Sequence, residues 1–325
     1  MAEQLSGTVL VVADHAGSAL SGPSTEVLTL ARSLTAGPVA AVALTGEPDT
    51  AALGRFGAGT VYVPDLDGLS PTVAAVAAEA VLAAVAQARP EAVLLVSSFA
   101  GKEIAARLAV ALGSGAIVDA TGVSVADGTL VVAKTVLQGT WDTTCVVTRG
   151  VPVVAVKPTA VTAAELPDAG PAEPVAVPVE FSQAARAVRV VSRTEHPGGG
   201  RAPLSEAKVV VVGGRGVAGD FSLVEELADL LGGAVGATRV ATDEGWIDHA
   251  AQIGQTGVTI SPRLYVGVGV SGAIHHTAGM QSAETVVVVN NDADAPIFEM
   301  ADLGVVGDAT EVLPQAIAEL RRRRG

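Results

Sequence analysis

The sequence predicts an α/β protein with two domains, each a mainly parallel sheet flanked by helices. Short apolar runs rich in β-branched residues alternate with Ala- and Leu-rich stretches of helical length. The runs are apolar at nearly every position, which is typical of strands that a parallel sheet buries on both faces. A chain of 325 residues is long enough for two domains, since a domain commonly has about 100–200 residues.

The first domain is predicted to span residues 1–196. Its first strands are expected at 8–12, 39–44 and 92–97, and its helices at 25–34, 73–88 and 102–112. Two extended runs, 123–126 and 130–135, flank Asp127-Gly128, a dipeptide that favours a two-residue hairpin turn. Further strands are expected at 144–147, 153–156 and 188–191. The domain therefore begins with alternating strands and helices and becomes richer in strands after residue 123.

The second domain is predicted to span residues 197–325. It follows the run His196-Pro197-Gly198-Gly199-Gly200, which has the composition of a linker. Its strands are expected at 208–212, 264–268, 285–289 and 305–306. Its helices are expected at 220–231, from near Gly272, and at 310–323.

Charge and hydropathy exclude several classes of protein. The chain has 20 basic and 34 acidic residues, and its net charge of −14 opposes binding to nucleic acid or anionic lipid. The closing run from Arg321 to Arg324 ends a predicted helix, where cations complement exposed carbonyls. The longest apolar stretch, 73–88, contains Glu79 and is shorter than the roughly 20 residues of a spanning helix.

The start of the chain and its cysteine content predict a cytoplasmic protein. Residues 1–6 contain no basic cluster before an apolar core, as a secretory signal would. The single cysteine, Cys145, cannot form an internal disulfide, which is typical of a reducing compartment.

Two glycine-rich turns in the second domain are the strongest chemical signal. Gly213-Gly214-Arg215-Gly216 follows one predicted strand, and Gly267-Val268-Gly269-Val270-Ser271-Gly272 ends another. Glycine lets a phosphate approach backbone N–H groups, and the start of a helix favours negative charge. At the carboxyl ends of parallel strands, such turns can bind the pyrophosphate of a dinucleotide. The alternative is that the glycines only permit tight packing between strands and helices.

A nicotinamide-dependent dehydrogenase of Rossmann type is an alternative function, because the second turn matches G-x-G-x-x-G. Such a site would also use an acidic residue at the end of the next strand, where Asn290 and Asn291 stand. The adjacent His275 and His276 would point in different directions on a helix and cannot chelate one metal together. We find no nucleophile–base set and assign no catalytic residue and no metal ligand. This absence favours an electron carrier over an enzyme.

The run from Leu264 to Met280 resembles the signature of the electron transfer flavoprotein alpha subunit. The stretches 290–298 and 301–308 resemble the family as well. Upstream, Gly213-Gly214-Arg215-Gly216, Gly236-Ala237-Thr238-Arg239 and Ile253-Gly254-Gln255-Thr256-Gly257 follow in the family's order. The resemblance implies a Rossmann-like N-terminal domain that packs on a beta subunit, and a C-terminal FAD-binding domain.

The resemblance also implies which residues bind FAD. They are Arg215, Thr238, Arg239, Ile253, Gly254, Gln255, Thr256, Ser271, Gly272, Ala273, Ile274, His275, His276, Asn290 and Asp308.

Within this set, the resemblance places Thr238 and Arg239 beside the isoalloxazine ring and the Thr256 hydroxyl at flavin N5. Arg215 would lie at the adenine or pyrophosphate end, and His276 at the pyrimidine end of the ring. A guanidinium from Arg239 and a donor from His276 would stabilise negative charge on the reduced ring.

The remaining residues would hold the rest of the cofactor. Residues 271–274 would surround the pyrophosphate, and Asn290 and Asp308 would bind the adenosine part. The family usually has Ser where Thr238 stands, which preserves a hydroxyl. It usually has Gln where His275 stands, a larger departure that leaves the role of His275 open.

The implied function is an electron carrier without substrate turnover of its own. It would hold one FAD per heterodimer, together with a beta subunit that completes the flavin site and binds AMP. Electrons would arrive from acyl-CoA dehydrogenases of fatty acid beta-oxidation, or similar flavoprotein dehydrogenases, and leave to a membrane quinone oxidoreductase. A flavin-free binding or scaffold protein of the same fold is a further alternative.

Overall fold

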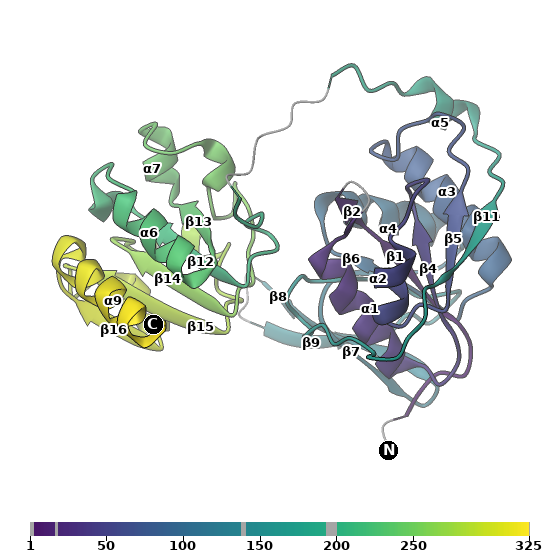
Figure 1. The fold of residues 1–325 in the computed structure, drawn as a ribbon, viewed down its shortest axis with the longest axis horizontal. Helices are drawn as coiled ribbons and strands as arrows, with labels where there is room; N and C mark the ends of the chain where they lie inside the picture. Colours follow the sequence, from purple (N-terminus) through teal and green to yellow (C-terminus); the bar gives the residue numbers. More distant parts are fainter. Residues whose placement is uncertain (1–2, 17–18, 138–140, 193–199, 325) are drawn as a thin grey trace. The chain divides into compact units, whose positions relative to one another are not determined.

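The structure is a computed structural model that describes residues 3–16, 19–137, 141–192 and 200–324. The chain forms two compact units, Met1–Glu195 and His196–Gly325 (Figure 1). The predicted domain boundary at His196 falls in 193–199, outside the described residues. Among the described residues, no helix is long and apolar enough to cross a membrane.

The first unit is built on a nine-stranded sheet with the strand order β11-β5-β4-β1-β6-β10-β7-β8-β9. Pairing is parallel from β11 to β7 and antiparallel from β7 to β9. The strands are β1 Val9–Ala13, β4 Val39–Ala43, β5 Thr60–Pro64, β6 Ala92–Val96, β7 Ala116–Ala126, β8 Thr129–Val136, β9 Trp141–Cys145, β10 Val153–Val156 and β11 Glu173–Val177. A separate pair joins β2 His15–Ala16 to β3 Ala19–Leu20.

Helices cover both faces of this sheet. They are α1 Gly22–Leu34, α2 Thr50–Arg55, α3 Ala74–Ala88, α4 Phe99–Ala111 and α5 Gln183–Ala187. Alternate residues of β1 enter different cores: Val9 and Val11 pack with α1, whereas Leu10 and Val12 pack with α3 and α4. This two-sided burial explains why the strand is apolar at every position, and it confirms the predicted fold class.

The predicted hairpin is present between β7 and β8. Asp127 has φ +49° and Gly128 has φ +69°, as a two-residue turn of the type favoured by Asp-Gly requires. The carboxylate of Glu3 accepts hydrogen bonds from both turn N–H groups, at 2.9 and 3.0 Å. Strand β7 is longer than predicted because its first half, from Ala116, pairs with β10 before its second half enters the hairpin.

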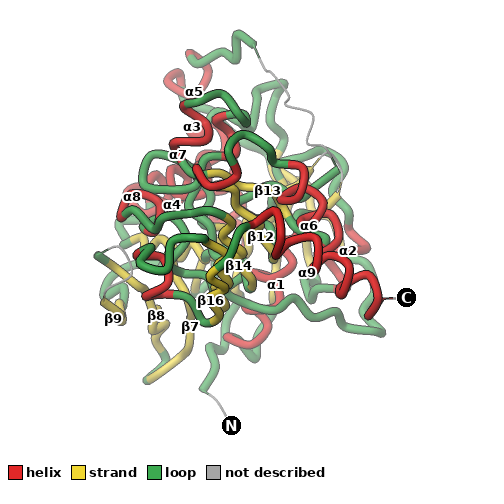
Figure 2. The backbone as a smooth tube through the Cα atoms, turned by 90° about the vertical axis from the view of Figure 1, so that its left-hand side faces the viewer, coloured by secondary structure: helices red, strands yellow, loops and turns green. Residues whose placement is uncertain are grey.

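The second unit contains a five-stranded, fully parallel sheet with the order β13-β12-β14-β15-β16. Its strands are β12 Val209–Gly213, β13 Ala234–Ala237, β14 Leu264–Val268, β15 Thr285–Asn290 and β16 Leu303–Val306. Its helices are α6 Ser222–Leu231, α7 Arg239–Asp243, α8 Ile274–Thr277 and α9 Ala309–Arg324, with short 3₁₀ turns η1 Arg215–Val217, η2 His249–Ala251 and η3 Pro296–Met300. Helices α6 and α9 lie side by side over one face of the sheet (Figures 1 and 2).

The basic run at the end of α9 is paired within the second unit. Arg321 forms an ion pair with Glu226 of α6 at 2.8 Å, and Arg322 pairs with Glu319 at 2.6 Å. Arg324 donates to the backbone carbonyl of Leu230 near the end of α6. Arg321 and Arg324 therefore tie α9 to α6, whereas Arg322 pairs within α9.

The strand predicted at 188–191 is wrong. The residues follow α5 without pairing, and Val191 is 96% exposed. High β-propensity does not produce a strand where no neighbouring surface buries the side chains.

Several short elements were not predicted. Strand β13 has the sequence Ala-Val-Gly-Ala, in which Ala and Gly are poor strand formers. Strand β11 contains Pro174, which the sheet tolerates because β11 is its edge strand. The elements α2, β5, α5 and α7 were also missed.

Candidate functional site

The predicted site residues gather at one edge of the second sheet. Because its strands are parallel, their carboxyl ends meet at this edge. The segments that follow β12, β13, β14 and β16 carry Arg215, Thr238, residues 271–276 and Asp308, and Asn290 is the last residue of β15.

The two glycine-rich turns pack directly against each other. The N–H of Gly214 donates to Val268 O at 2.9 Å, and that of Gly216 donates to Gly269 O at 3.0 Å. A Cβ on Gly214 would lie 2.2 Å from Gly269 O, and Gly269 itself has φ +61°. Tight packing therefore accounts for these glycines without any ligand.

The end of the second turn and the residue after it present unused backbone donors. Ser271 and Ala273 are exposed, and the N–H groups of residues 271–273 donate no hydrogen bond to the described residues. The helix that follows, α8, has only four residues and cannot supply the strong terminal dipole expected from the sequence. Any anion here would be held by individual N–H groups.

Thr238 and Arg239 join β13 to α7. The Thr238 N–H donates to Gly213 O at 3.1 Å, which fixes Thr238 beside the first glycine turn. Its Oγ1 is buried and has no hydrogen-bond partner among the described residues. Such an unsatisfied hydroxyl is costly, so this position fits a bound polar group such as a flavin ring.

Arg239 is a surface cation held by a neighbour on its own helix. Its Nε lies 3.1 Å from Asp243 Oδ2, and both side chains are more than half exposed. Arg215, in η1, is also exposed, and its guanidinium makes no hydrogen bond or ion pair with the described residues. Both guanidinium groups are accessible to an anionic ligand.

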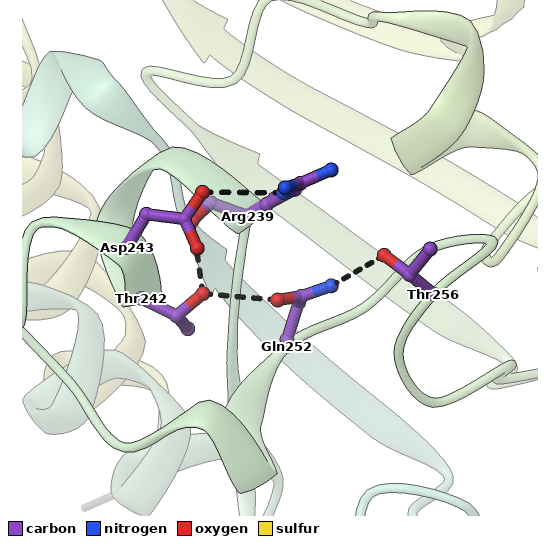
Figure 3. Close-up of polar contacts among 5 residues, drawn as sticks. All are labelled: Arg239, Thr242, Asp243, Gln252 and Thr256. Atoms are coloured by element: carbon purple, nitrogen blue, oxygen red, sulfur yellow. Dashed lines mark hydrogen bonds and ion pairs between the residues drawn. The ribbon is translucent and has the colours of Figure 1, made fainter.

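A polar chain links Thr256 to α7 through Gln252 (Figure 3). Gln252 is 8% exposed; its Nε2 donates to Thr256 Oγ1 at 2.9 Å, and its Oε1 accepts from Thr242 Oγ1 at 3.1 Å. The Thr242 hydroxyl also lies 2.9 Å from the carbonyl of Arg239. Neither Gln252 nor Thr242 was predicted from the sequence as a site residue.

The two adjacent histidines point in different directions, as their spacing predicts. His275 is exposed, and its Nδ1 lies 2.9 Å from Gln255 Oε1, while the Gln255 N–H donates to His275 O at 2.7 Å. These bonds tie the loop of Gln255 to α8.

His276 is buried and bonded at both ring nitrogens. Its Nδ1 donates to Ile253 O at 3.0 Å, because a carbonyl can only accept, and its Nε2 accepts from the Tyr265 hydroxyl at 2.8 Å. Burial lowers the pKa of His276 to about 4, so the ring is neutral at physiological pH. The resemblance implied that His276 donates a hydrogen bond to the flavin ring. In this structure its N–H donates to Ile253 O instead.

Asn290 and Asp308 also act within the domain. The Asn290 amide donates to Val270 O at 2.8 Å and thereby holds the second glycine turn. Asp308 accepts from the N–H and hydroxyl of Thr310 at the start of α9, and these bonds hold its pKa below the ordinary value. Both are placed at the predicted edge and stabilise the loops that carry the site.

No group of three or more His, Cys, Asp or Glu side chains that could hold a metal ion is found within the described part of the chain. A flavin dinucleotide needs polar partners for its ring and for its pyrophosphate. The site offers the unpartnered Thr238 hydroxyl, the unused N–H groups of 271–273 and two accessible guanidinium groups. The residues present therefore fit FAD.

Comparisons with known proteins agree with this chemistry. Residues 9–182 match the electron transfer flavoprotein domain, and residues 203–281 match the electron transfer flavoprotein FAD-binding domain. The chain is 42% identical over 323 residues to the electron transfer flavoprotein subunit alpha of Mycobacterium leprae, covering 97% of this chain and 99% of that protein.

Two further relatives carry the same name. That of Mycobacterium tuberculosis (strain H37Rv) is 43% identical over 324 residues, which is 98% of this chain and 99% of the relative. That of Syntrophomonas wolfei is 37% identical over 270 residues, covering 82% and 84% of the two chains. Together with the fold and the flavin-compatible edge, these similarities show that the chain belongs to the electron transfer flavoprotein alpha subunit family.

Proposed function

We propose that this chain carries one FAD in a heterodimer with a beta subunit, which completes the flavin site and itself binds AMP. The dimer accepts electrons from acyl-CoA dehydrogenases or similar flavoprotein dehydrogenases and passes them to a membrane quinone oxidoreductase. The chain acts in the cytoplasm, in fatty acid beta-oxidation, without turning over a substrate of its own.

The observation that carries the proposal is the unpartnered hydroxyl of Thr238. It is buried at the carboxyl edge of the FAD-binding domain, between the first glycine turn and the cation Arg239. FAD, when bound, supplies the redox chemistry, and protein groups around it set its potentials.

The roles of the chain's own residues follow from their positions. Thr238 and Thr256 offer hydroxyl groups to the ring, and Arg239 offers positive charge that favours the reduced state. The N–H groups of 271–273 and the guanidinium of Arg215 bind the pyrophosphate. The wall beside the ring is formed by Ile253, Gly254, Gln255, Ile274 and His275. The loops are held in place by Asn290, Asp308 and His276.

The nicotinamide alternative has less support. It relied on G-x-G-x-x-G, and two of these glycines, Gly269 and Gly272, have close backbone neighbours that explain them. A nicotinamide site would have an acidic residue for the ribose where Asn290 stands. The Asn290 amide instead donates to Val270 O.

Electron transfer in a purified system tests the proposal. The heterodimer is mixed with acyl-CoA dehydrogenase and its acyl-CoA substrate, and the visible absorbance of the flavin is followed. We expect bleaching on reduction and recovery after addition of membranes that contain the quinone oxidoreductase. A flavin that no dehydrogenase of this class reduces would contradict the proposed donors.

A further inference from the structure

We propose that Gln252 is a positioning residue, which holds the Thr256 hydroxyl as a hydrogen-bond donor toward FAD. The proposal rests on the proposed function and adds to it a residue that does not touch the ring. Its basis is the polar chain from Thr256 through Gln252 to Thr242 (Figure 3).

The donors and acceptors among these hydrogen-bonded side chains determine which partner the Thr256 hydroxyl proton can have. An amide Nε2 can only donate, so in the bond of 2.9 Å Thr256 Oγ1 is the acceptor. The Thr256 proton then makes no hydrogen bond with any described residue. Because Thr256 is exposed, that proton is available to an acceptor outside the domain.

The other end of the Gln252 amide is also held. Its Oε1 accepts from the Thr242 hydroxyl at 3.1 Å, a proton that Thr242 shares with the Arg239 carbonyl at 2.9 Å. In this orientation the amide presents Nε2, and not Oε1, to Thr256. A reversed amide would accept the Thr256 proton and remove it from the ligand.

Burial makes this orientation effective. Gln252 is 8% exposed and Thr242 is 2% exposed, so water does not compete for their bonds. The Gln252 backbone is fixed as well, because the Val258 N–H donates to its carbonyl at 2.8 Å and the backbone at Gly257 packs so closely that an added Cβ would lie 2.3 Å from the same oxygen. The Thr256 loop is therefore tied to Gln252 through both side chain and backbone.

The hydrogen-bonded side chains of Thr256, Gln252 and Thr242 also connect the two sides of the proposed ring site. Thr256 lies on the loop after Gln252, whereas Thr242 belongs to α7, the helix that begins with Arg239. Gln252 thus sets the position of the Thr256 donor relative to the helix that carries the Arg239 cation.

A double-mutant cycle on the flavin potential tests the proposal in the FAD-loaded heterodimer. Gln252→Met keeps the side-chain length but removes both polar atoms, and Thr256→Val removes the hydroxyl. Reduction adds electron density to the ring, so a donor stabilises the reduced state more than the oxidised one. We expect Gln252→Met to lower the reduction equilibrium constant by about 2- to 10-fold, the range of one hydrogen bond. In the Thr256→Val background the same substitution should have little further effect.

Thr242→Val provides a second variant that leaves Gln252 in place. It removes the hydroxyl bonded to Gln252 Oε1, and we expect a smaller shift in the same direction that also vanishes with Thr256→Val. Flavin content and melting temperature, measured on every variant, show that the site remains formed.

Two results would overturn the proposal. One is a potential unchanged in both Gln252→Met and Thr242→Val while FAD stays bound. The other is a shift of equal size with and without the Thr256 hydroxyl, which would mean that Gln252 acts independently of Thr256. A wild-type heterodimer that binds no FAD would instead contradict the proposed function itself.

Discussion

The hydroxyl of Tyr265 donates a hydrogen bond of 2.8 Å to Nε2 of His276, inside the core of the FAD-binding domain. Tyr265 is fully buried and His276 is 6% exposed. The other ring nitrogen of His276 donates to Ile253 O, so the ring connects the start of β14, helix α8 and the loop that leads to Thr256. Two residues eleven positions apart thus stabilise the elements that carry the proposed flavin site.

Removing the Tyr265 hydroxyl should weaken the second domain. In Tyr265→Phe, the His276 Nε2 becomes a buried acceptor without a partner, and we expect a loss of about 1–3 kcal/mol in the free energy of unfolding. Denaturant unfolding measures it. Tyr62→Phe, in the first domain, is the matched control, because the Tyr62 hydroxyl makes no hydrogen bond to described residues. Equal effects of the two substitutions would show that the Tyr265–His276 bond adds no stability.

The low pKa of His276 predicts a dependence of stability on pH. In the unfolded chain histidine binds a proton near pH ~6.5, whereas folded His276 does so only at about 4. The unfolded state therefore binds more protons between these values. The contribution is fully present above pH ~6.5 and is lost as pH falls toward 4. For a shift of this size it is on the order of 3 kcal/mol.

Nuclear magnetic resonance of the histidine side chains checks this directly. We expect the His276 signal, assigned with the variant His276→Gln, to stay that of a neutral ring protonated at Nδ1 until the pH approaches 4. Titration near the ordinary histidine value would mean that the ring is solvated, contrary to the structure.

Arg239 is expected to favour the reduced flavin. Arg239→Ala should remove about 1–3 kcal/mol of stabilisation from the negatively charged reduced state, the range for bonds to charged groups. This corresponds to roughly one to two decades in the reduction equilibrium constant. Asp243→Asn is the complementary variant: it frees the guanidinium from its ion pair and should shift the potential upward. Stepwise reduction followed by visible spectroscopy measures both, and an unaltered potential in Arg239→Ala would remove Arg239 from the site.

The sequence predicted well those strands that the sheet buries on both faces, because such strands are apolar at nearly every position. Strands such as β1, β6 and β12 are near-continuous Val, Leu and Ala runs, and their positions were predicted to within one or two residues. The run 188–191 is also rich in Val, although it contains Arg189, but it pairs with no described strand, and Val content alone does not distinguish the two cases. Strand β13 was missed because its Ala and Gly residues become a strand only through pairing with β12.

For the site, the segments could be predicted but their internal bonds could not. The resemblance indicated Thr256 and His276, whereas Gln252 and Tyr265 were missed because their roles depend on side-chain contacts made after folding. A signal for Tyr265 exists in the sequence: a tyrosine within an apolar strand must find a partner for its hydroxyl. The two functions of the glycine turns, packing and anion binding, share one sequence pattern, and only the contact between Gly214 and Gly269 separates them.

The flavin content of the purified heterodimer shows whether this chain holds FAD with its beta partner. The chain is produced with its beta partner, saturated with FAD, freed of unbound cofactor, and its flavin absorbance is compared with its protein concentration. We predict one FAD per heterodimer and little FAD on the isolated chain, because the proposed function has the beta subunit complete the flavin site. Thr238→Val, which removes the buried hydroxyl, should lower FAD retention, while Thr238→Ser should preserve it. An intact heterodimer that remains colourless would contradict the account.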